Sequence, residues 1–203
     1  MQTIYLTNIR SLAPSIEYYY ALLGSKRKEK MMSYCFLDDR LRCLAGGLLL
    51  EQIAKGKEIQ YTEYGKPFLS DGPYFNLSHS GDYVCLAVSA SAPVGIDIER
   101  HCDQDFTALG KTAFHPIEYE FLMQEPGYNR FYDLWTLKES YLKMKGLSFI
   151  IEPSSFCVLQ DCLVLPQGET PYIKNLNYVK GYSMALCAGE PIDVHITEIH
   201  TFP

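Results

Sequence analysis

Two carboxylates share one face of a short strand-like segment near the middle of the chain. In Gly95-Ile96-Asp97-Ile98-Glu99 the alternation sends Ile96 and Ile98 to one face and both acids to the other. The acids would lie about 6.6 Å apart along the strand, so they repel each other unless water or a cation lies between them. Hard carboxylate oxygens without a His or Cys cluster favour magnesium over zinc. A solvated strand edge remains the alternative for this segment alone.

A predicted helix further along the chain carries a second mixed group of side chains. At about 100° per residue, one side of it holds Trp135, Lys138, Glu139, Leu142 and Lys143. A face that mixes the chain's one Trp with Lys and Glu is not an ordinary core stripe. The alternative is a surface ion pair between Glu139 and Lys143, four residues apart.

The segment FNLSHSGD, residues 75–82, offers donors for phosphate oxygens. Ser78 and His79 follow a strand-like run and precede the turn residue Gly81, where side chains and backbone amides could hold an anion. Neighbouring residues in a strand point to opposite faces, so a catalytic pair of Ser78 with His79 is not expected.

A local basic stretch stands out against an acidic chain. The formal net charge is −6 and the sequence pI is about 5.4, which argues against general nucleic-acid binding. Such a patch suits a compact polyanion, such as the phosphate of a nucleotide, and a solvated helix face is the alternative. Its cations are Lys26, Arg27, Lys28, Lys30, Arg40 and Arg42, against the anions Glu29, Asp38 and Asp39.

The elements that must position these residues follow from hydrophobic periodicity. Strands are expected at 3–9, 74–77, 83–89 and 94–99, and helical segments at 15–23, 25–54, 103–112, 116–124 and 129–145. Short strands are expected beyond residue 155. The sequence Tyr64-Gly65-Lys66-Pro67 indicates a loop.

The whole chain indicates a globular protein. Its 203 residues are 47% hydrophobic, which is enough to bury a core. There is no stretch of about 18 apolar residues and no charged start followed by an apolar run, so we expect neither membrane insertion nor export. The seven cysteines contain no C-x-x-C pair and are expected to be reduced and mostly buried.

An internal echo suggests a repeated architecture. Residues 81–88 (GDYVCLAV) resemble residues 181–188 (GYSMALCA), and alternating segments follow at 94–99 and 192–199. Chance likeness between short β segments is the alternative. If the repeat is real, it predicts two similar α+β lobes about a pseudo-twofold axis.

The repeat predicts an N-terminal lobe at residues 1–100 and a C-terminal lobe at residues 101–203, with a ligand site in the cleft between them. In the alternating segment that follows each copy, only the first copy carries a pair of acids on one face. Asp97 and Glu99 stand where the second copy has His195 and Thr197. One lobe alone would therefore supply the carboxylate pair.

Taken together, the motifs resemble those of the Sfp-type 4′-phosphopantetheinyl transferases. The patterns G-x-D-x-E and W-x-x-K-E-x-x-K are both complete in GIDIE and WTLKESYLK, and YGKP and FNLSHSG precede them. The likeness continues through KGLS and GYSMALCAG, so it covers most of the chain. It implies a pseudo-dimeric α+β fold with coenzyme A bound between the lobes.

The resemblance also assigns roles by motif match. Asp97, Glu99 and Glu139 would hold magnesium on the pyrophosphate of coenzyme A, and Lys143 would meet a phosphate of the same group. The residues implied near the adenosine end and its 3′-phosphate are Arg27, Lys30, Arg42, Lys66, Ser78 and His79.

The implied reaction is the attack of a serine hydroxyl of an apo acyl or peptidyl carrier protein on the β-phosphate of coenzyme A, which releases 3′,5′-ADP. Glu139 could accept the serine proton and Lys143 would supply a fixed cation. The expected protein is a cytoplasmic monomer that binds neither nucleic acid nor membrane. Its rivals are a non-catalytic coenzyme A binding module and a magnesium-dependent phosphohydrolase.

Two departures from the family pattern concern Ser140 and the chain length. Ser140 stands where Ala is common, which should be tolerated. At 203 residues the chain is somewhat short for the family, which leaves its choice of carrier open.

Overall fold

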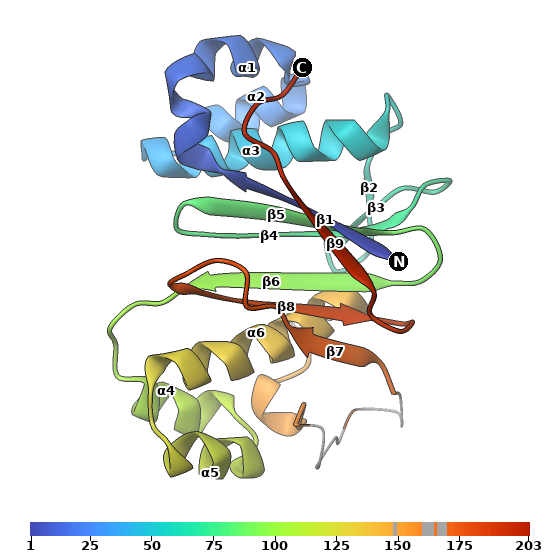
Figure 1. Ribbon diagram of the computed structural model, residues 1–203. Helices are drawn as coiled ribbons and strands as arrows, with labels where there is room; N and C mark the ends of the chain where they lie inside the picture. Colours follow the sequence, from blue (N-terminus) through green and yellow to red (C-terminus); the bar gives the residue numbers. More distant parts are fainter. Residues whose placement is uncertain (148–149, 160–164, 166–169) are drawn as a thin grey trace.

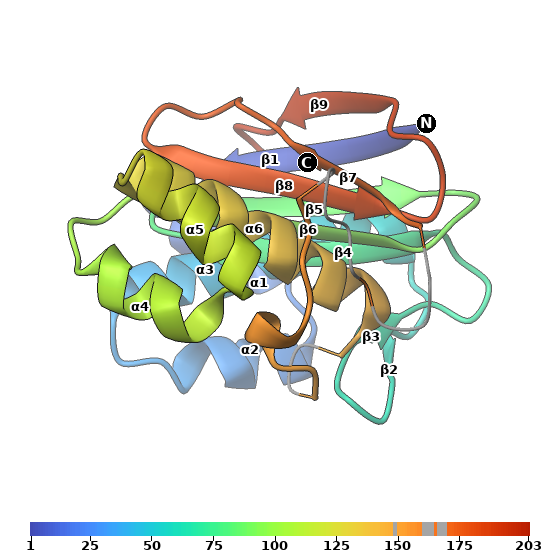
Figure 2. The same ribbon diagram turned by 90° about the horizontal axis from the view of Figure 1, so that it is seen from below.

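Two β-sheets pack face to face and each has helices on its outer side. In the computed structural model, which describes residues 1–147, 150–159, 165 and 170–203, three helices lie on the outer side of one sheet and three on the outer side of the other (Figure 1). Figure 2 gives the view from below, along the direction in which the layers stack, so that helices lie in front of strands. The expected α+β class with two similar lobes is confirmed.

The first half of the chain builds the upper two layers of Figure 1. Its elements are β1 (Gln2–Asn8), the 3₁₀ turns η1 (Ile9–Ser11) and η2 (Ala13–Ser15), α1 (Ile16–Leu22), α2 (Ser25–Met32), α3 (Leu37–Ala54), β2 (Gln60–Tyr61), β3 (Pro67–Phe68), β4 (Tyr74–Ser80) and β5 (Tyr83–Ser89).

The second half builds the lower two layers and adds one strand, β9, to the upper sheet. Its elements are β6 (Val94–Arg100), α4 (Phe106–Ala113), α5 (Pro116–Gln124), α6 (Tyr128–Lys145), the 3₁₀ turn η3 (Pro153–Ser155), β7 (Tyr172–Asn175), β8 (Tyr182–Ala188) and β9 (Val194–Glu198). The expected strands beyond residue 155 are thus found from residue 172 onward, and positions 160–164 and 166–169 lie outside the described residues.

The helical region expected at 25–54 is two helices, α2 and α3. The chain leaves the helix at residues 33–36, where the Ser33 hydroxyl donates to the Lys30 carbonyl at 2.7 Å. Phe36 then takes an extended conformation before α3 begins. The break turns the chain so that cations from both helices meet over one strand, as described below.

The sheets repeat one local order. The first sheet runs β4-β5-β1-β9 and the second runs β6-β8-β7. In each, a strand (β1 or β6) leads into helices and then into an antiparallel pair (β4–β5 or β7–β8) whose last strand lies beside the first. The echo between 81–88 and 181–188 therefore corresponds to two strands, β5 and β8, in matching positions.

The segments after the echo do not match in this way. β6 pairs antiparallel with β8, whereas β9 pairs parallel with β1 in the other sheet. β6 thus pairs with a strand from the second half of the chain, and β9 pairs with a strand from the first half. Strand pairing therefore crosses the division expected at residue 100, and that division stays a prediction.

The apolar faces of the two sheets meet in one core. Ile4, Leu6 and Cys85 of the first sheet pack with Ile96 and Ile98 of β6. The alternation in GIDIE thus has the expected consequence, with the isoleucines buried between the sheets and the acids on the other face. The outer faces are covered by α1–α3 on one side and by α6 on the other.

In the described part of the chain, no helix combines the length and the apolar character that a membrane crossing needs. No disulfide joins the six described cysteines, four of which are buried, and Cys162 lies outside the described residues.

Candidate active site

Gly95 lets the two central motifs meet. A Cβ atom at this position would lie 2.1 Å from the Ser140 carbonyl oxygen and 2.3 Å from the Met144 nitrogen, both in the backbone of α6. No side chain larger than hydrogen fits there, so α6 crosses β6 at the glycine. The crossing places the acidic face of β6 against the side of α6 that carries Lys143 and Glu139.

Asp97 and Lys143 form an ion pair at this crossing. Lys143 Nζ lies 2.5 Å from Asp97 Oδ1, and the Ser78 hydroxyl donates to the same oxygen at 2.8 Å. Burial disfavours the charged form of Lys143, but Asp97 and Glu139 outweigh it and raise the Lys143 pKa. The Asp97 side chain is almost fully buried, and burial raises its pKa against the opposing effect of Lys143.

Glu99 and Glu139 complete an acidic cluster around this pair. Burial and the Asp97 charge raise the pKa of Glu99 to about 7, although the Ser80 hydroxyl donates to Glu99 at 2.7 Å. Burial and Asp97 also raise the pKa of Glu139. Lys143 lowers the pKa of each of these three carboxyl groups but does not offset the burial that raises them.

β4 joins the two sheets through every second side chain. Asn76 Oδ1 accepts from the Ile96 N–H at 2.9 Å, Ser78 Oγ from the Ile98 N–H at 3.3 Å, and Ser80 Oγ from the Arg100 N–H at 3.1 Å. These bonds satisfy the open edge of β6. The period-2 pattern N-x-S-x-S is the sequence signal for this arrangement, and the sequence analysis did not use it.

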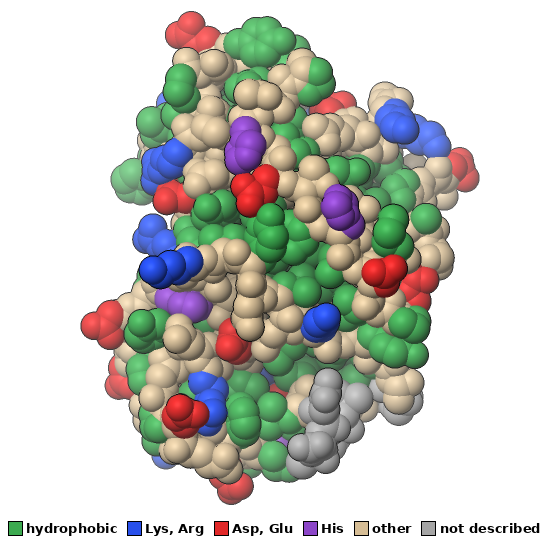
Figure 3. Space-filling model, in the orientation of Figure 1, with side chains coloured by type: hydrophobic (Ala, Val, Ile, Leu, Met, Phe, Trp, Pro, Cys, Tyr) green, Lys and Arg blue, Asp and Glu red, His purple; other side chains and the backbone are tan. Residues whose placement is uncertain are grey.

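His79 points to the opposite face of β4 and lines a basic pocket. The pocket has a volume of about 100 Å³, and Arg27, Lys30, Asp39 and Arg42 line it together with His79. Lys and Arg side chains gather along the edge of the molecule where β6 ends and the β4–β5 turn lies (Figure 3). The structure thus brings together four of the residues expected at the 3′-phosphate.

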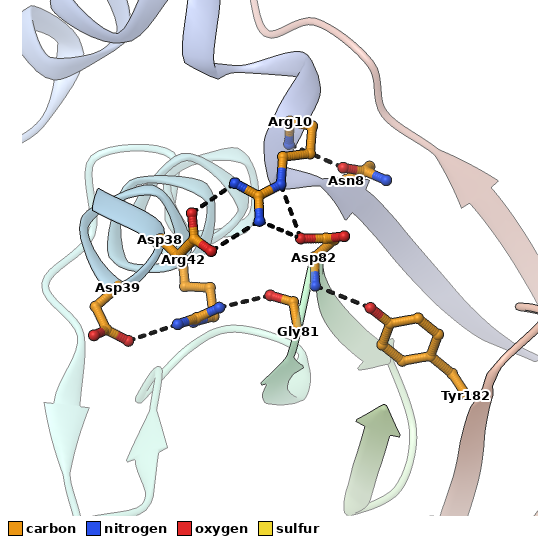
Figure 4. Close-up of polar contacts among 8 residues, drawn as sticks. All are labelled: Asn8, Arg10, Asp38, Asp39, Arg42, Gly81, Asp82 and Tyr182. Carbon is orange, nitrogen blue, oxygen red and sulfur yellow. Dashed lines mark hydrogen bonds and ion pairs between the residues drawn. The ribbon is translucent and has the colours of Figure 1, made fainter. Parts of the chain in front are cut away.

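Arg42 is fixed in this pocket by two acceptors. One terminal nitrogen donates to the Gly81 carbonyl at 2.6 Å and the other to Asp39 Oδ1 at 2.7 Å (Figure 4). Gly81 has a φ of +53°, and a Cβ there would lie 2.5 Å from the Tyr182 hydroxyl. The β4–β5 turn therefore needs a glycine to present its carbonyl to Arg42.

Ser78 and Lys66 lie apart from this pocket. Ser78 belongs to the acidic side of β4, as its bonds to Asp97 and Lys143 show. Lys66 Nζ donates to the Met144 carbonyl at 2.5 Å, at the end of α6, and burial lowers the Lys66 pKa to about 8. Neither lines the pocket of His79, and their role toward coenzyme A stays a prediction.

Lys138 of the W-x-x-K-E-x-x-K pattern is a structural residue. Its Nζ lies 2.6 Å from Glu118 Oε2 in an ion pair with no exposed side-chain surface, and it also donates to the Phe156 carbonyl at 2.5 Å. The other Glu118 oxygen accepts from the Val158 N–H. This network ties α5 and the segment after α6 to α6 itself, and sequence reasoning missed it because Glu118 lies in an unremarkable helix.

Lys138→Met should therefore destabilise the fold by about 3 kcal/mol, since it leaves the Glu118 charge buried without its partner. The double variant Lys138→Met/Glu118→Leu should recover part of that loss. Urea unfolding of the three proteins measures both effects. A single variant as stable as the parent chain would contradict the structural role.

A cavity of about 920 Å³ lies just beyond the end of β6. Its lining includes His101, Asp133 and Ser183, which form a hydrogen-bonded chain. The Ser183 hydroxyl donates to Asp133 at 2.6 Å and bonds His101 Nε2 at 2.9 Å. His101 also stacks on Tyr132 with ring centroids 5.3 Å apart. The cavity opens two residues after Glu99 and is large enough for an extended organic group.

The carboxyl groups of the acidic cluster offer the oxygen ligands that magnesium prefers, but in this arrangement they do not form a metal site. Among the residues that the structure describes, no three His, Cys, Asp or Glu side chains stand ready to hold a metal. Asp97 Oδ2, however, is buried and has no hydrogen-bond partner. An unpaired carboxylate oxygen beside two further carboxyl groups fits a hard cation.

The fold and the site together define a two-lobed protein with a small basic pocket on one face of β4 and an acidic cluster on the other. The comparisons with known proteins agree. Residues 93–187 match the family model for the 4′-phosphopantetheinyl transferase superfamily, and residues 12–91 match the model for the N-terminal part of 4′-phosphopantetheinyl transferases.

Individual relatives cover most of the chain. It is 34% identical over 194 residues to 4′-phosphopantetheinyl transferase Sfp of Bacillus subtilis, which spans 86% of both chains. It is 32% identical to 4′-phosphopantetheinyl transferase psf-1 of Bacillus pumilus over 92% of this chain and 87% of the relative. A match to 4′-phosphopantetheinyl transferase HetI of a Nostoc species is 34% identical over 62% of this chain and 60% of that relative. The chain belongs to the Sfp-type 4′-phosphopantetheinyl transferases.

Proposed function

We propose that this chain transfers the 4′-phosphopantetheine arm of coenzyme A to a serine of an apo acyl or peptidyl carrier protein and releases 3′,5′-ADP. The observation that carries the proposal is the position of two charged sites on opposite faces of β4. Ser78 faces the acidic cluster, whereas His79 faces the basic pocket. Coenzyme A offers a pyrophosphate and a separate 3′-phosphate, one for each site. We further propose that the protein acts as a monomer in the cytoplasm.

Asp97, Glu99 and Glu139 would hold magnesium, in line with the unpaired Asp97 oxygen and the raised pKa values of the other two carboxyls. When bound to the pyrophosphate, the ion would neutralise the charge that develops on the leaving phosphate. Lys143 would then pass from its contact with Asp97 to a phosphate oxygen, since both anions attract it.

The protein's own groups position the reactants. The serine oxygen of the carrier attacks the β-phosphorus, the bond from that phosphorus to the oxygen of the 3′,5′-ADP leaving group breaks, and Glu139 takes the serine proton. Burial raises the pKa of Glu139, which makes its carboxylate a stronger base. We place the pantetheine arm and the carrier serine at the cavity beyond β6, because its lining begins two residues after Glu99.

The formation of 3′,5′-ADP tests this proposal against its rivals. The purified chain is incubated with coenzyme A and magnesium, with and without each member of a panel of apo carriers, and the nucleotides are separated. A transferase forms 3′,5′-ADP only when a suitable carrier is present. Release without any carrier would indicate a phosphohydrolase, and binding without release in the whole panel would indicate a binding module. The panel also identifies the carrier class.

Arg27→Ala and Lys30→Ala should each raise the KM for coenzyme A by about 10-fold and leave the KM for dephospho-coenzyme A nearly unchanged. Both side chains line the pocket of His79, and each should contribute one charge-assisted contact to the 3′-phosphate. Steady-state kinetics with both substrates measures the effect. Lys28→Ala serves as the control, because Lys28 lies on the same helix but does not line the pocket. Equal effects on the two substrates would contradict this role.

The magnesium requirement should fall as the pH rises from 6 to 8. The Glu99 pKa is about 7, so below this pH a proton must leave Glu99 before a cation can bind. Above this pH Glu99 is already ionised and no proton has to leave. The half-saturating magnesium concentration should thus fall about 5-fold between pH 6 and 7, and about 10-fold in total by pH 8, where it levels off. Titration of activity with magnesium at each pH measures this. A requirement independent of pH would exclude Glu99 as a titrating ligand.

A further inference from the structure

Asp39 is an acid inside the basic pocket. It lines the same small cavity as Arg27, Lys30, Arg42 and His79, where the proposed function places the 3′-phosphate. An anion at that position repels a phosphate. We infer that Asp39 limits the affinity of the pocket for the 3′-phosphate and thereby speeds the release of 3′,5′-ADP. This inference rests on the proposed function.

Asp39 is not the only group that holds Arg42 in place. Arg42 already donates to the Gly81 carbonyl at 2.6 Å, and its contact with Asp39 Oδ1 is made by the other terminal nitrogen at 2.7 Å. The side chains of Arg42 and Asp39 are 19% and 36% exposed, so a ligand in the pocket can reach both. The phosphate and Asp39 therefore compete for the same guanidinium nitrogen.

The neighbouring acid, Asp38, pairs with Arg10, which is outside the pocket. Arg10 binds it through two nitrogens at 2.6 and 2.8 Å and also contacts Asp82 (Figure 4). Asp38 is not among the residues that line the pocket. Of the two acids in the first turn of α3, only Asp39 thus faces the proposed phosphate site, and Asp38 offers a control with the same charge.

Contacts with the 3′-phosphate stabilise the bound substrate and the bound product alike. The 3′-phosphate remains on the adenosine end throughout the reaction, so every contact with it stabilises coenzyme A, the transition state and 3′,5′-ADP equally. Such contacts lower KM without raising the chemical rate, and in excess they slow product release. The negative charge of Asp39 in the pocket weakens these contacts and so sets the balance between substrate binding and product release.

Asp39→Asn tests the inference, because it removes the charge and keeps an oxygen that Arg42 can use. Isothermal titration should show roughly 3- to 10-fold tighter binding of coenzyme A and of 3′,5′-ADP, because one nearby repulsion is lost. Binding of dephospho-coenzyme A and of 5′-AMP should not change. Asp38→Asn should leave the affinity ratio of coenzyme A to dephospho-coenzyme A at the parent value. Inhibition of transfer by 3′,5′-ADP should increase in Asp39→Asn alone.

Three results would overturn the inference. Weaker binding of coenzyme A to Asp39→Asn would show that Asp39 chiefly positions Arg42. An equal gain for both coenzyme A and dephospho-coenzyme A would show a general charge effect. If the parent chain transfers phosphopantetheine yet binds the two coenzymes equally well, the pocket does not read the 3′-phosphate, and the inference fails while the proposed transfer stands. A parent chain with no transfer activity would instead defeat the proposed function.

Discussion

Replacing Asp97 with alanine is expected to lower the rate of phosphopantetheine transfer by about 10³-fold. Asp97 contributes the buried oxygen without a partner and also anchors Lys143, so its loss removes a proposed metal ligand and disturbs the fixed cation together. Transfer to an apo carrier at ordinary magnesium concentration measures the effect. Thermal unfolding should show that the fold persists, since the removed carboxylate is itself costly to bury.

Asp193→Ala is a suitable control for this variant. It removes the same charge from an exposed position in the segment before β9, the edge strand that pairs with β1. Its activity should match that of the parent chain. Full activity of Asp97→Ala at ordinary magnesium would refute the assignment of Asp97 as a metal ligand.

Glu139→Gln is expected to depress kcat by about 10³-fold for two separable reasons. The change keeps the size of the side chain but removes its charge and its basic oxygen, so both metal binding and proton transfer suffer. Raising magnesium should overcome weaker metal binding but not the loss of a base. We expect partial recovery, with a deficit of about 10²-fold remaining at saturating metal, a size typical of general-base loss.

The magnesium dependence of kcat in Glu139→Gln separates these roles. A matched comparison with Glu99→Gln helps, because Glu99 is proposed to be a ligand only and its variant should recover more fully. Complete recovery of Glu139→Gln at high magnesium would exclude Glu139 as an essential base. The base would then have to be another group, such as Glu99 or water.

The fold was predictable where periodicity is strong. Alternation placed Ile96 and Ile98 in the core and the acids opposite them, and the echo of residues 81–88 in 181–188 corresponds to β5 and β8 in matching positions. The equivalence of the following segments was not predictable, because β6 and β9 both read as alternating strands and only long-range pairing assigns them to different sheets. Nor did periodicity show the break at residues 33–36, which divides the predicted helix into α2 and α3.

The candidate site was predictable in its residue types more than in its contacts. Strand geometry correctly separated Ser78 from His79, but it could not show that Ser78 bonds to Asp97 or that Lys66 lies against the end of α6. Such contacts depend on where α6 crosses β6, which the backbone at Gly95 decides. Lys138 has the same residue type as Lys143 in one motif, yet only the tertiary position of Glu118 makes it structural.

The intact mass of an apo carrier protein before and after incubation with this chain, coenzyme A and magnesium tests the central claim most directly. The account predicts that the carrier gains the mass of one phosphopantetheine and that 3′,5′-ADP appears in equal amount. A carrier whose acceptor serine is replaced by alanine should gain nothing. If no carrier in a panel from fatty acid, polyketide and peptide synthesis gains this mass, while coenzyme A still binds to the chain, the account of this protein as a transferase is contradicted.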